Sequence, residues 1–358
     1  MNTSSGTGAR VGMGAGVGAD AGTHAGAGVG AGAGVRTGPA GVRGSAEAAG
    51  IARVAIVGTG VIGASWAAHF LARGLDVVAT DPAPGAEERL RADVAALRPT
   101  LAGGSASGAR PARLTFTADA AEAAAEADFI QENGPEREDV KRALFARLDA
   151  AARPGVVLAG SSSGLATTVI ARDCVAHPER VLIGHPFNPP HLIPLVEVVP
   201  GENTGEDAVR TALAFYTSVG KKPIRLRREL PGHLANRLQA ALWREAYSLV
   251  DRGAATVADI DTAIAYGPGL RWAILGPFAN QHLSGGPGGI AHVLAHLGPP
   301  TEAWWRDLGD PSLTPELTAK LVAGVAEALA GVDDTALAAR RDALLSLLLA
   351  AKADADLP

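Results

Sequence analysis

The sequence predicts an α/β protein in which a doubly wound sheet is followed by an all-helical C-terminal domain. Three observations carry this prediction. A short apolar run, a glycine-rich turn, a helical pattern and a second apolar run follow one another within residues 51–81. Strand and helix patterns then alternate as far as residue 228. From residue 232 onward the pattern is helical only.

The first 50 residues stand apart from this pattern. Sixteen of the 45 glycines in the chain lie there, mostly alternating with alanine or valine. Such a segment has too few large side chains to offset the ordering entropy of its backbone. We therefore expect residues 1–50 to be a disordered tail. The rest suits two domains, which we place at residues 51–230 and 231–358.

Each element of the domain over residues 51–230 follows from a local pattern. Residues 51–58 form a β-branched apolar run that ends in glycine, as a buried parallel strand does. Residues 60–74 repeat large apolar side chains at helical spacing, and residues 75–81 form the second strand. A helix and a loop share residues 84–113. Later strands are expected at 113–117, 128–133, 156–163, 180–187, 195–201 and 221–228, and later helices at 118–127, 138–151, 165–172 and 205–219.

The domain over residues 231–358 begins with a long amphipathic helix, expected at 232–253. Thr256, with Asp259 three residues later, is typical of a capping box that opens the next helix. Thr314 precedes a proline and a glutamate, which is the pattern of another helix start. These signals predict several helices and no further strand.

Composition and charge exclude several classes of protein. The formal net charge is −5 and no block of lysine or arginine occurs, so nucleic acid is not expected as a partner. The chain contains no run of 18 apolar residues, so no membrane span is predicted. The N-terminal segment also lacks the pattern of a signal peptide. Cys174 is the only cysteine, so no internal disulfide can form. We therefore predict a cytoplasmic protein that binds no membrane.

The sequence GTGVIG at residues 58–63 matches the G-x-G-x-x-G pattern directly between a strand and a helix. In a Rossmann fold these glycines allow a tight turn, a close approach of the backbone to a pyrophosphate, and close contact between helix and strand. The N-terminus of the helix offers free N–H groups and a positive dipole end to the phosphates. The expected cofactor contacts in this turn are Gly58, Gly60, Val61, Ile62 and Gly63.

Asp81 stands at the end of the second strand, 18 residues beyond Gly63. A carboxylate at this place accepts hydrogen bonds from ribose hydroxyls and repels a 2′-phosphate. We therefore expect NAD as the cofactor in preference to NADP. The alternative is an ordinary aspartate in an Asp-Pro turn.

His185 and Glu197 lie 12 residues apart, each on an apolar strand. Burial of these groups is unfavourable unless they pair with one another. In such a pair the carboxylate fixes the imidazole tautomer and stabilises its cation, as a base that removes a hydroxyl proton requires. The spacing alone supports equally well a hydrogen bond between His185 and Glu197 that has only a structural role.

Several segments together resemble the 3-hydroxyacyl-CoA dehydrogenase family: VAIVGTGVIG, QENGPEREDVKRALFARLD, GSSSGL, HPFNPPHLIPLVEVVPG and ELPGHLANRLQ. The likeness runs from Val54 to Pro277. It extends to relatives that act on free hydroxy acids, namely carnitine dehydrogenases, gulonate dehydrogenases of the lambda-crystallin type and ketoreductases of aromatic polyketide pathways. It implies reversible hydride transfer between NAD and the 3-hydroxy group of a hydroxy acid or its thioester.

The resemblance also implies roles for single residues. His185 corresponds to the catalytic base and Glu197 to its carboxylate partner. Ser163 corresponds to the serine that hydrogen-bonds the reacting oxygen, and Asn236 to the asparagine that helps to hold substrate and histidine. Taken alone, Ser163 and Asn236 would be interpreted as a turn serine and a helix-surface amide. Two further residues are expected beside the cofactor: Glu132 on the nicotinamide side, and Lys141.

Two features depart from the acyl-CoA members of the family. Those enzymes carry a lysine-rich helical arm after the second strand, whereas the matching residues 82–113 here are shorter and contain no lysine. Residues 265–278 contain GLRW, which resembles the relatives that act on free acids. Arg271 in this element can bind a substrate carboxylate through both nitrogens, or it can be a structural arginine at the domain junction. Both features favour a free hydroxy acid over a long acyl-CoA.

Two other interpretations remain open. One is a binding protein that kept the fold and lost the chemistry, as crystallins do; the other is a biosynthetic ketoreductase that works on a polyketide acid. No metal is expected, because hydride transfer needs none and five other histidines are not spaced as ligands. Those histidines are His191, His233, His282, His292 and His296. The resemblance and the long amphipathic helices predict a homodimer.

Overall fold

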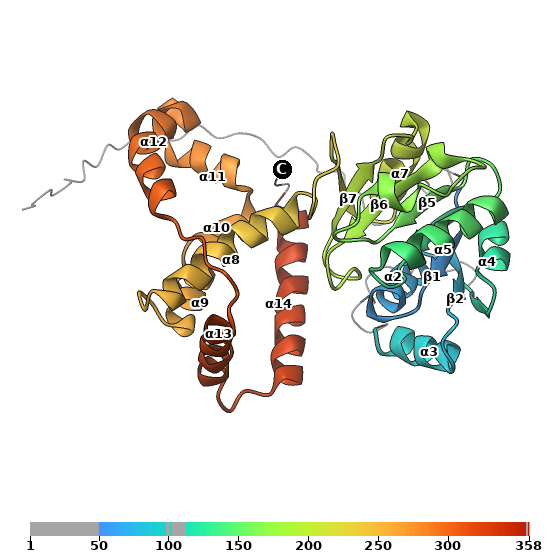
Figure 1. The fold of residues 1–358 in the computed structure, drawn as a ribbon, viewed down its shortest axis with the longest axis horizontal. Helices are drawn as coiled ribbons and strands as arrows, with labels where there is room; N and C mark the ends of the chain where they lie inside the picture. The colour runs from blue at the N-terminus through green and yellow to red at the C-terminus, as the bar shows by residue number, and fades with distance from the viewer. Residues whose placement is uncertain (1–49, 98–100, 102–111, 356, 358) are drawn as a thin grey trace, which may run out of the picture. The chain divides into compact units, whose positions relative to one another are not determined.

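The computed structural model describes residues 50–97, 101, 112–355 and 357. Strands and helices alternate as far as residue 225, and from residue 235 onward every described element is helical (Figure 1). The predicted fold class, a Rossmann-type α/β sheet followed by an all-α part, is confirmed. The tail predicted at residues 1–50 and the loop predicted before residue 113 lie almost wholly outside the described residues.

The sheet has eight strands in the order β3-β2-β1-β4-β5-β6-β7-β8. All neighbouring strands are parallel except β6 and β7, which are antiparallel. The chain order reverses at β1, between β2 and β4, which is where a doubly wound sheet binds ligands beyond its carboxyl ends. The strands are β1 (Arg53–Val57), β2 (Asp76–Thr80), β3 (Leu114–Thr117), β4 (Phe129–Glu132), β5 (Val157–Gly160), β6 (Val181–Pro186), β7 (Leu195–Pro200) and β8 (Lys222–Arg225).

Helices cover both faces of this sheet, and each face has its own apolar core. The first core includes Trp66, Phe70, Phe129, Phe215 and Tyr216, which are fully buried. It lies under α2 (Val61–Ala72), α3 (Ala86–Leu97) and α7 (Glu206–Ser218). The second core, which includes Phe145 and Leu158, lies under α4 (Ala120–Glu126), α5 (Glu138–Ala151) and α6 (Thr167–Ile170).

The helix α6 is shorter than the helix predicted at 165–172. All four of its residues are β-branched, and such side chains favour helix only weakly; they are Thr167, Thr168, Val169 and Ile170. The hydroxyls of Thr167 and Thr168 also bond outside the helix, to the carbonyl of Val199 and to the carboxylate of Glu229.

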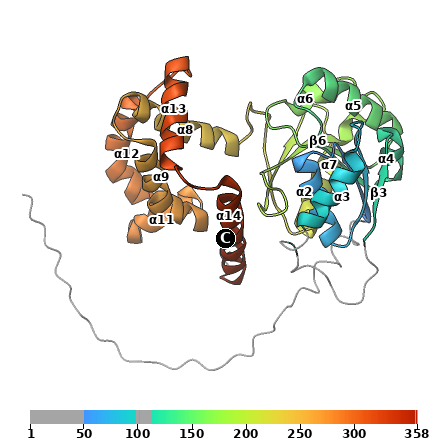
Figure 2. The same ribbon diagram turned by 90° about the horizontal axis from the view of Figure 1, so that it is seen from below.

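The helical part starts later than its pattern predicts. Gly232 and His233 have left-handed backbone conformations, with φ of +73° and +50°, so α8 (Ala235–Asp251) begins three residues after position 232. The predicted capping box of Thr256 with Asp259 is present, and Thr314 caps its helix as expected. Figure 2 shows α8, α9 and α13 packed together. The remaining helices are α9 (Val257–Tyr266), α10 (Pro268–Ile274), α11 (Pro277–Ser284), α12 (Gly289–Asp307), α13 (Pro315–Ala328) and α14 (Asp334–Asp354).

Within the part of the chain that the structure describes, no helix combines the length and the apolar character that a membrane crossing requires.

Candidate active site

The glycine-rich turn between β1 and α2 has little room for side chains, except at one position. Gly58 has a φ of +89°, and a Cβ there would lie 2.8 Å from the backbone carbon of Asn133. A Cβ on Gly63 would lie 2.0 Å from the carbonyl oxygen of Gly58. A Cβ on Gly60 would meet no atom within 4 Å. Two glycines are thus needed by the fold itself, whereas Gly60 leaves its backbone open to a ligand.

The N-terminus of α2 at this turn has the polarity that an anion requires. No side chain caps the helix, and no acidic residue lies in its first turn. The first N–H groups of a helix, here those of Val61 and Ile62, have no partner within it and can donate to a ligand. Asp81 borders the turn: one of its carboxylate oxygens accepts from the N–H (2.8 Å) and hydroxyl (3.1 Å) of Thr59, and the other from the N–H of Ala83 (2.9 Å). Each carboxylate oxygen can accept more than one hydrogen bond, so Asp81 keeps capacity for ribose hydroxyls.

His185 and Glu197 face one another across the antiparallel pair β6 and β7, where they are directly opposed in register. His185 Nδ1 lies 2.8 Å from Glu197 Oε2. The exposed fraction is 6% for His185 and 0% for Glu197. An ionised carboxylate only accepts hydrogen bonds, so Nδ1 of His185 donates in this contact. The hydrogen bond leaves Nε2 as the ring nitrogen that does not face Glu197.

Glu197 is held in its charged form by contacts from two directions. Burial by itself would raise the pKa of Glu197, but the hydrogen bond with His185 and those from the backbone outweigh it and lower the pKa. The backbone donors are the N–H groups of Leu234 and Ala235, each 2.9 Å from Oε1. These amides open α8, so its first turn, which carries Asn236, is bound directly to the histidine–glutamate pair.

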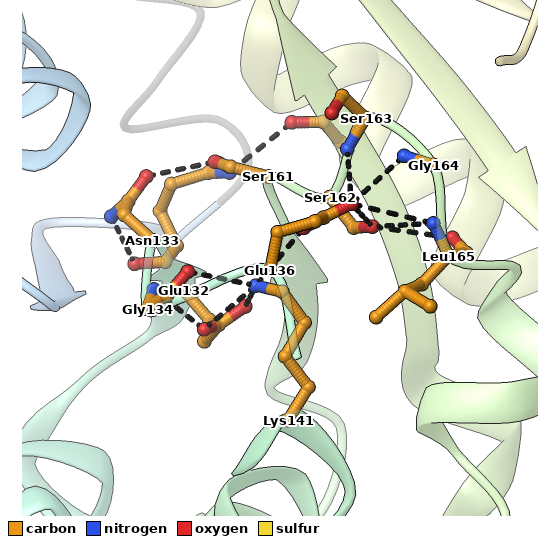
Figure 3. A network of polar contacts seen from close by, with 12 residues as sticks. Glu132, Asn133, Gly134, Glu136, Lys141, Ser161, Ser162, Ser163, Gly164 and Leu165 are labelled. Atoms are coloured by element: carbon orange, nitrogen blue, oxygen red, sulfur yellow. Dashed lines mark hydrogen bonds and ion pairs between the residues drawn. The ribbon is translucent and has the colours of Figure 1, made fainter. Parts of the chain in front are cut away.

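Ser163 lies in the loop of residues 161–165 after β5, which we call the serine loop (Figure 3). One carboxylate holds this loop. Oε1 of Glu136 accepts from the hydroxyl of Ser162 (2.6 Å) and from the N–H groups of Ser163 (3.1 Å) and Gly164 (2.8 Å). Burial alone would raise the pKa of Glu136, but these hydrogen bonds and Lys141 lower it.

Sequence reasoning did not identify Glu136 as part of the site. Its only sequence signal is its place four residues after Glu132, just before α5. Its four loop donors lie 26 to 29 residues further along the chain, so only the fold brings them to the carboxylate.

Glu132 and Lys141 form a buried ion pair below the serine loop (Figure 3). The Lys141 ammonium donates to both oxygens of Glu132, at 3.0 and 2.8 Å, and to the carbonyl of Gly134 at 3.2 Å. Burial raises the pKa of Glu132, and the charge of Lys141 opposes this rise. Both side chains are covered, with exposed fractions of 0% and 1%. This ion pair fixes the backbone at Gly134, which passes beside Gly58.

A second buried network joins the ends of β4, β5 and β6, and sequence reasoning also missed it. The hydroxyl of Tyr216 donates to Gln131 (2.6 Å), whose amide nitrogen donates to the hydroxyl of Ser161 (2.8 Å) and the carbonyl of Gly184 (3.2 Å). A Cβ on Gly184 would lie 2.0 Å from the Tyr216 oxygen. The network therefore holds the serine loop in register with the strand that carries His185.

Arg271 is not joined to these groups. It lies in α10, its side chain is exposed, and no hydrogen bond or ion pair links its guanidinium to a described residue. Its carbonyl accepts from the side-chain amide of Asn280 at 3.1 Å.

Two family models match the chain. The model for the NAD binding domain of 3-hydroxyacyl-CoA dehydrogenase matches residues 53–230, and the model for the C-terminal domain of the same enzyme matches residues 232–323. Together they cover more than half of the chain, which includes the glycine turn, the serine loop, the histidine–glutamate pair and α8.

Individual relatives agree with this family. An L-carnitine dehydrogenase from Streptomyces coelicolor is 53% identical over 293 residues, which are 82% of this chain and 92% of that protein. A 3-hydroxyacyl-CoA dehydrogenase from Gibberella moniliformis is 48% identical over 306 residues, which are 84% of this chain and 95% of that protein. Among solved structures, the NAD-dependent dismutase 5-formyl-3-hydroxy-2-methylpyridine 4-carboxylic acid 5-dehydrogenase has a TM-score of 0.72 at 30% identity and covers 84% of this chain and 98% of its own. The chain therefore belongs to the 3-hydroxyacyl-CoA dehydrogenase family and is an NAD-dependent dehydrogenase that acts on a hydroxyl group.

Proposed function

We propose that this dehydrogenase oxidises the 3-hydroxyl of a free hydroxy acid of the L-carnitine class, reversibly and with His185 as the general base. The observation that carries the chemistry is the buried hydrogen bond of 2.8 Å between His185 and Glu197. The substrate class is supported by the 53% identity to an L-carnitine dehydrogenase over nearly its whole length.

In the proposed mechanism the chain supplies orientation and proton transfer. NAD, when bound, accepts the hydride that leaves the carbinol carbon. Nε2 of His185 takes the hydroxyl proton, and the charge of Glu197 stabilises the imidazolium that results. Ser163 and Asn236 hydrogen-bond the reacting oxygen and orient it for this transfer. In the reverse direction the imidazolium returns the proton to the nascent alkoxide.

The residues present fit the cofactor. The backbone at Gly60 is open, the N-terminus of α2 carries no acidic side chain, and Asp81 keeps acceptor capacity beside it. We propose that Asp81 binds the ribose hydroxyls and selects NAD, and that Glu132 with Lys141 shapes the nicotinamide side through the backbone. The test compares NAD and NADP in unmodified protein and in Asp81→Ala. A preference of the unmodified protein for NADP would contradict this assignment.

A free acid fits the chain better than a long acyl-CoA. Residues 84–113 contain no lysine that could bind the phosphates of CoA, and Arg271 is an exposed guanidinium without an ion-pair partner among the described residues. We propose that Arg271 binds the substrate carboxylate. The acyl-CoA reaction stays the second candidate, because the Gibberella moniliformis relative named for it is 48% identical.

A substrate panel followed by NADH absorbance separates these candidates. It contains L-carnitine, 3-hydroxybutyrate, gulonate and 3-hydroxybutyryl-CoA, with reduction of an aromatic polyketide acid assayed in reverse. We expect kcat/KM to be highest for L-carnitine. A value for 3-hydroxybutyryl-CoA far above those of the free acids would overturn the proposed substrate class.

Variants of Arg271 sharpen the same test. Arg271→Met should raise KM for a free acid by about 10-fold or more, because a charge-assisted bidentate hydrogen bond is lost. Arg271→Lys should recover only part of the loss, since lysine lacks the planar pair of donors. Arg340→Met, on α14, is the matched control at an exposed arginine. Unchanged KM in Arg271→Met would remove Arg271 from the site.

We also propose that a second copy of this chain covers the helical part. The helices α9, α10, α11 and α14 bury no residue, and large apolar side chains are exposed along them and along α12. A folded chain rarely leaves so much apolar surface in water. Light scattering should give the mass of a dimer, and Trp304→Ser should weaken the dimer while Val175→Ser, a control at an exposed loop residue, should not. A monomer at micromolar concentration would contradict the proposal.

A further inference from the structure

His233 occupies an unusual position in the backbone. Among the described residues it is the only one other than glycine with a positive φ, at +50°. It lies between the last residues of the α/β part and the start of α8, and its exposed fraction is 1%. Left-handed backbone is unfavourable for a residue with a Cβ, so the surroundings must hold His233 in place.

The imidazole of His233 contacts two parts of the site at once. Its Nε2 lies 2.9 Å from the carbonyl oxygen of Ser162, in the serine loop. Its ring centroid lies 5.2 Å from that of His185, with the planes tilted by 54°. A carbonyl oxygen only accepts, so Nε2 of His233 carries the proton. Nδ1 is buried and has no hydrogen-bond partner among the residues that the structure describes.

The backbone that follows His233 binds the other half of the pair. The next two amides, of Leu234 and Ala235, donate to Oε1 of Glu197 at 2.9 Å each. Three consecutive residues therefore bind the serine loop, the catalytic histidine and its carboxylate partner. The left-handed turn at His233 is what directs the ring to one side and the following amides to the other.

The ring is suited to remain uncharged beside His185. Burial lowers the pKa of His233, and the carbonyl of Ser162 opposes this change in part. His185 lowers it further, whereas the nearby carboxylates of Glu197 and Glu136 raise it. Because the ring of His233 is neutral, it does not compete with His185 for the proton that His185 takes up.

We propose that His233 is a positioning residue for the dehydrogenase reaction. Its imidazole holds the serine loop at a fixed separation from His185, while the two amides after it hold Glu197. The donor at Nε2 is the essential element, because it makes the only hydrogen bond between this ring and a residue that the structure describes. The inference rests on the proposed roles of His185 and Ser163.

Three substitutions separate the donor, the ring and the backbone. His233→Phe keeps an aromatic ring and removes the donor. His233→Gln places a side-chain N–H at about the reach of Nε2. His233→Asn suits the left-handed backbone but is too short to reach Ser162. His296→Phe, at an exposed residue of α12, is the matched control.

We expect kcat on the best panel substrate to fall about 10-fold in His233→Phe and in His233→Asn, because the carbonyl of Ser162 is left unpaired. His233→Gln should recover kcat to within about threefold of the unmodified protein, a margin that one neutral hydrogen bond of imperfect geometry allows. Binding of NADH, measured by fluorescence, should stay unchanged in all three. An unchanged kcat in His233→Phe, or equal losses in His233→Phe and His233→Gln, would overturn the proposal.

A second readout needs no turnover. In protein labelled with 15N-histidine, the signals of His233, assigned by their loss in His233→Phe, should show a neutral ring protonated at Nε2 at pH 7 and above. A neutral ring protonated at Nδ1, or an imidazolium at pH 7, would overturn the proposal. Absence of turnover on every panel member would contradict the proposed function. The tautomer of His233 measured by NMR would still show whether its ring donates the hydrogen bond.

Discussion

The α/β part and the helical part of this chain differ in how they are held together. The α/β part has a separate buried core on each face of its sheet. In the helical part, the described residues include a single fully buried large apolar side chain, that of Leu317. The exposed side chains there include Trp272, Trp304 and Trp305, with exposed fractions of 46%, 63% and 65%.

This difference separates a part with its own cores from a part that we propose a second copy covers. The groups that we propose to bind the cofactor and move the proton lie on strand ends and loops between two cores. The helices after residue 235 have the amphipathic pattern of packed helices but lack a surface that covers them. We therefore expect the α/β part to determine the chemistry and the helical part to depend on a second copy.

Glycines give the largest expected contrast between the two parts. Gly63→Ala places a Cβ 2.0 Å from a backbone oxygen, so it should abolish NADH binding or folding. A Cβ on Gly298 in α12 would meet no atom within 4 Å beyond its chain neighbours and its own helix backbone. In Gly298→Ala the entropic gain of about 0.5–1 kcal/mol is opposed by Pro299, which disfavours helical backbone in the residue before it, so only a small change in stability is expected. NADH fluorescence titration and thermal unfolding measure both effects. Normal NADH affinity in Gly63→Ala would show that the turn is less crowded than described.

Large apolar side chains give the next contrast. Phe145→Ala removes a fully buried ring from the second core and should lower the free energy of unfolding by about 3–5 kcal/mol. Trp304→Ala removes a ring that is 63% exposed in one chain. Measured in dilute protein, it should change that free energy by less than about 0.5 kcal/mol. Guanidinium unfolding followed by circular dichroism provides both values, and equal losses would contradict the contrast.

A buried lysine gives the smallest contrast. Burial and Arg73 lower the pKa of Lys221 to about 7, while its ammonium donates to the carbonyls of Pro190 and Ile193. The unfolded lysine has a pKa near 10.4, so between pH 7 and 10 the unfolded chain binds more protons and stability rises with pH. The rise is at most about 1.4 kcal/mol per pH unit.

Lys221→Met should remove this rise, and Lys320→Met, at an exposed lysine of α13, should leave it unchanged. Urea midpoints at pH 7, 8 and 9 measure the slopes. Identical slopes in Lys221→Met and unmodified protein would show that this ammonium is charged in both states.

Local patterns were sufficient to predict most of the fold. The strand, glycine turn and helix at residues 53–72 depend on residues close in sequence, and so do the caps at Thr256 and Thr314. The start of α8 was predicted too early, because nothing in the helical periodicity reveals that His233 adopts a left-handed backbone.

The site was predictable only in part. The pairing of His185 with Glu197 follows from two apolar strands and a short connection, and the structure places the two in hydrogen-bond contact. Glu136 and His233 were missed, because their partners in the serine loop lie 26 and 71 residues away in sequence. Their contacts depend on the sheet order. The catalytic roles of these residues stay predictions until they are measured.

The most direct test of the proposed chemistry is NADH formation from L-carnitine by His185→Ala, beside unmodified protein and with NADH affinity measured in both. We expect turnover to fall by about 10²–10⁴-fold, the usual contribution of a general base, while NADH affinity stays within about twofold. Turnover equal to that of unmodified protein would contradict the assignment of His185 as the base.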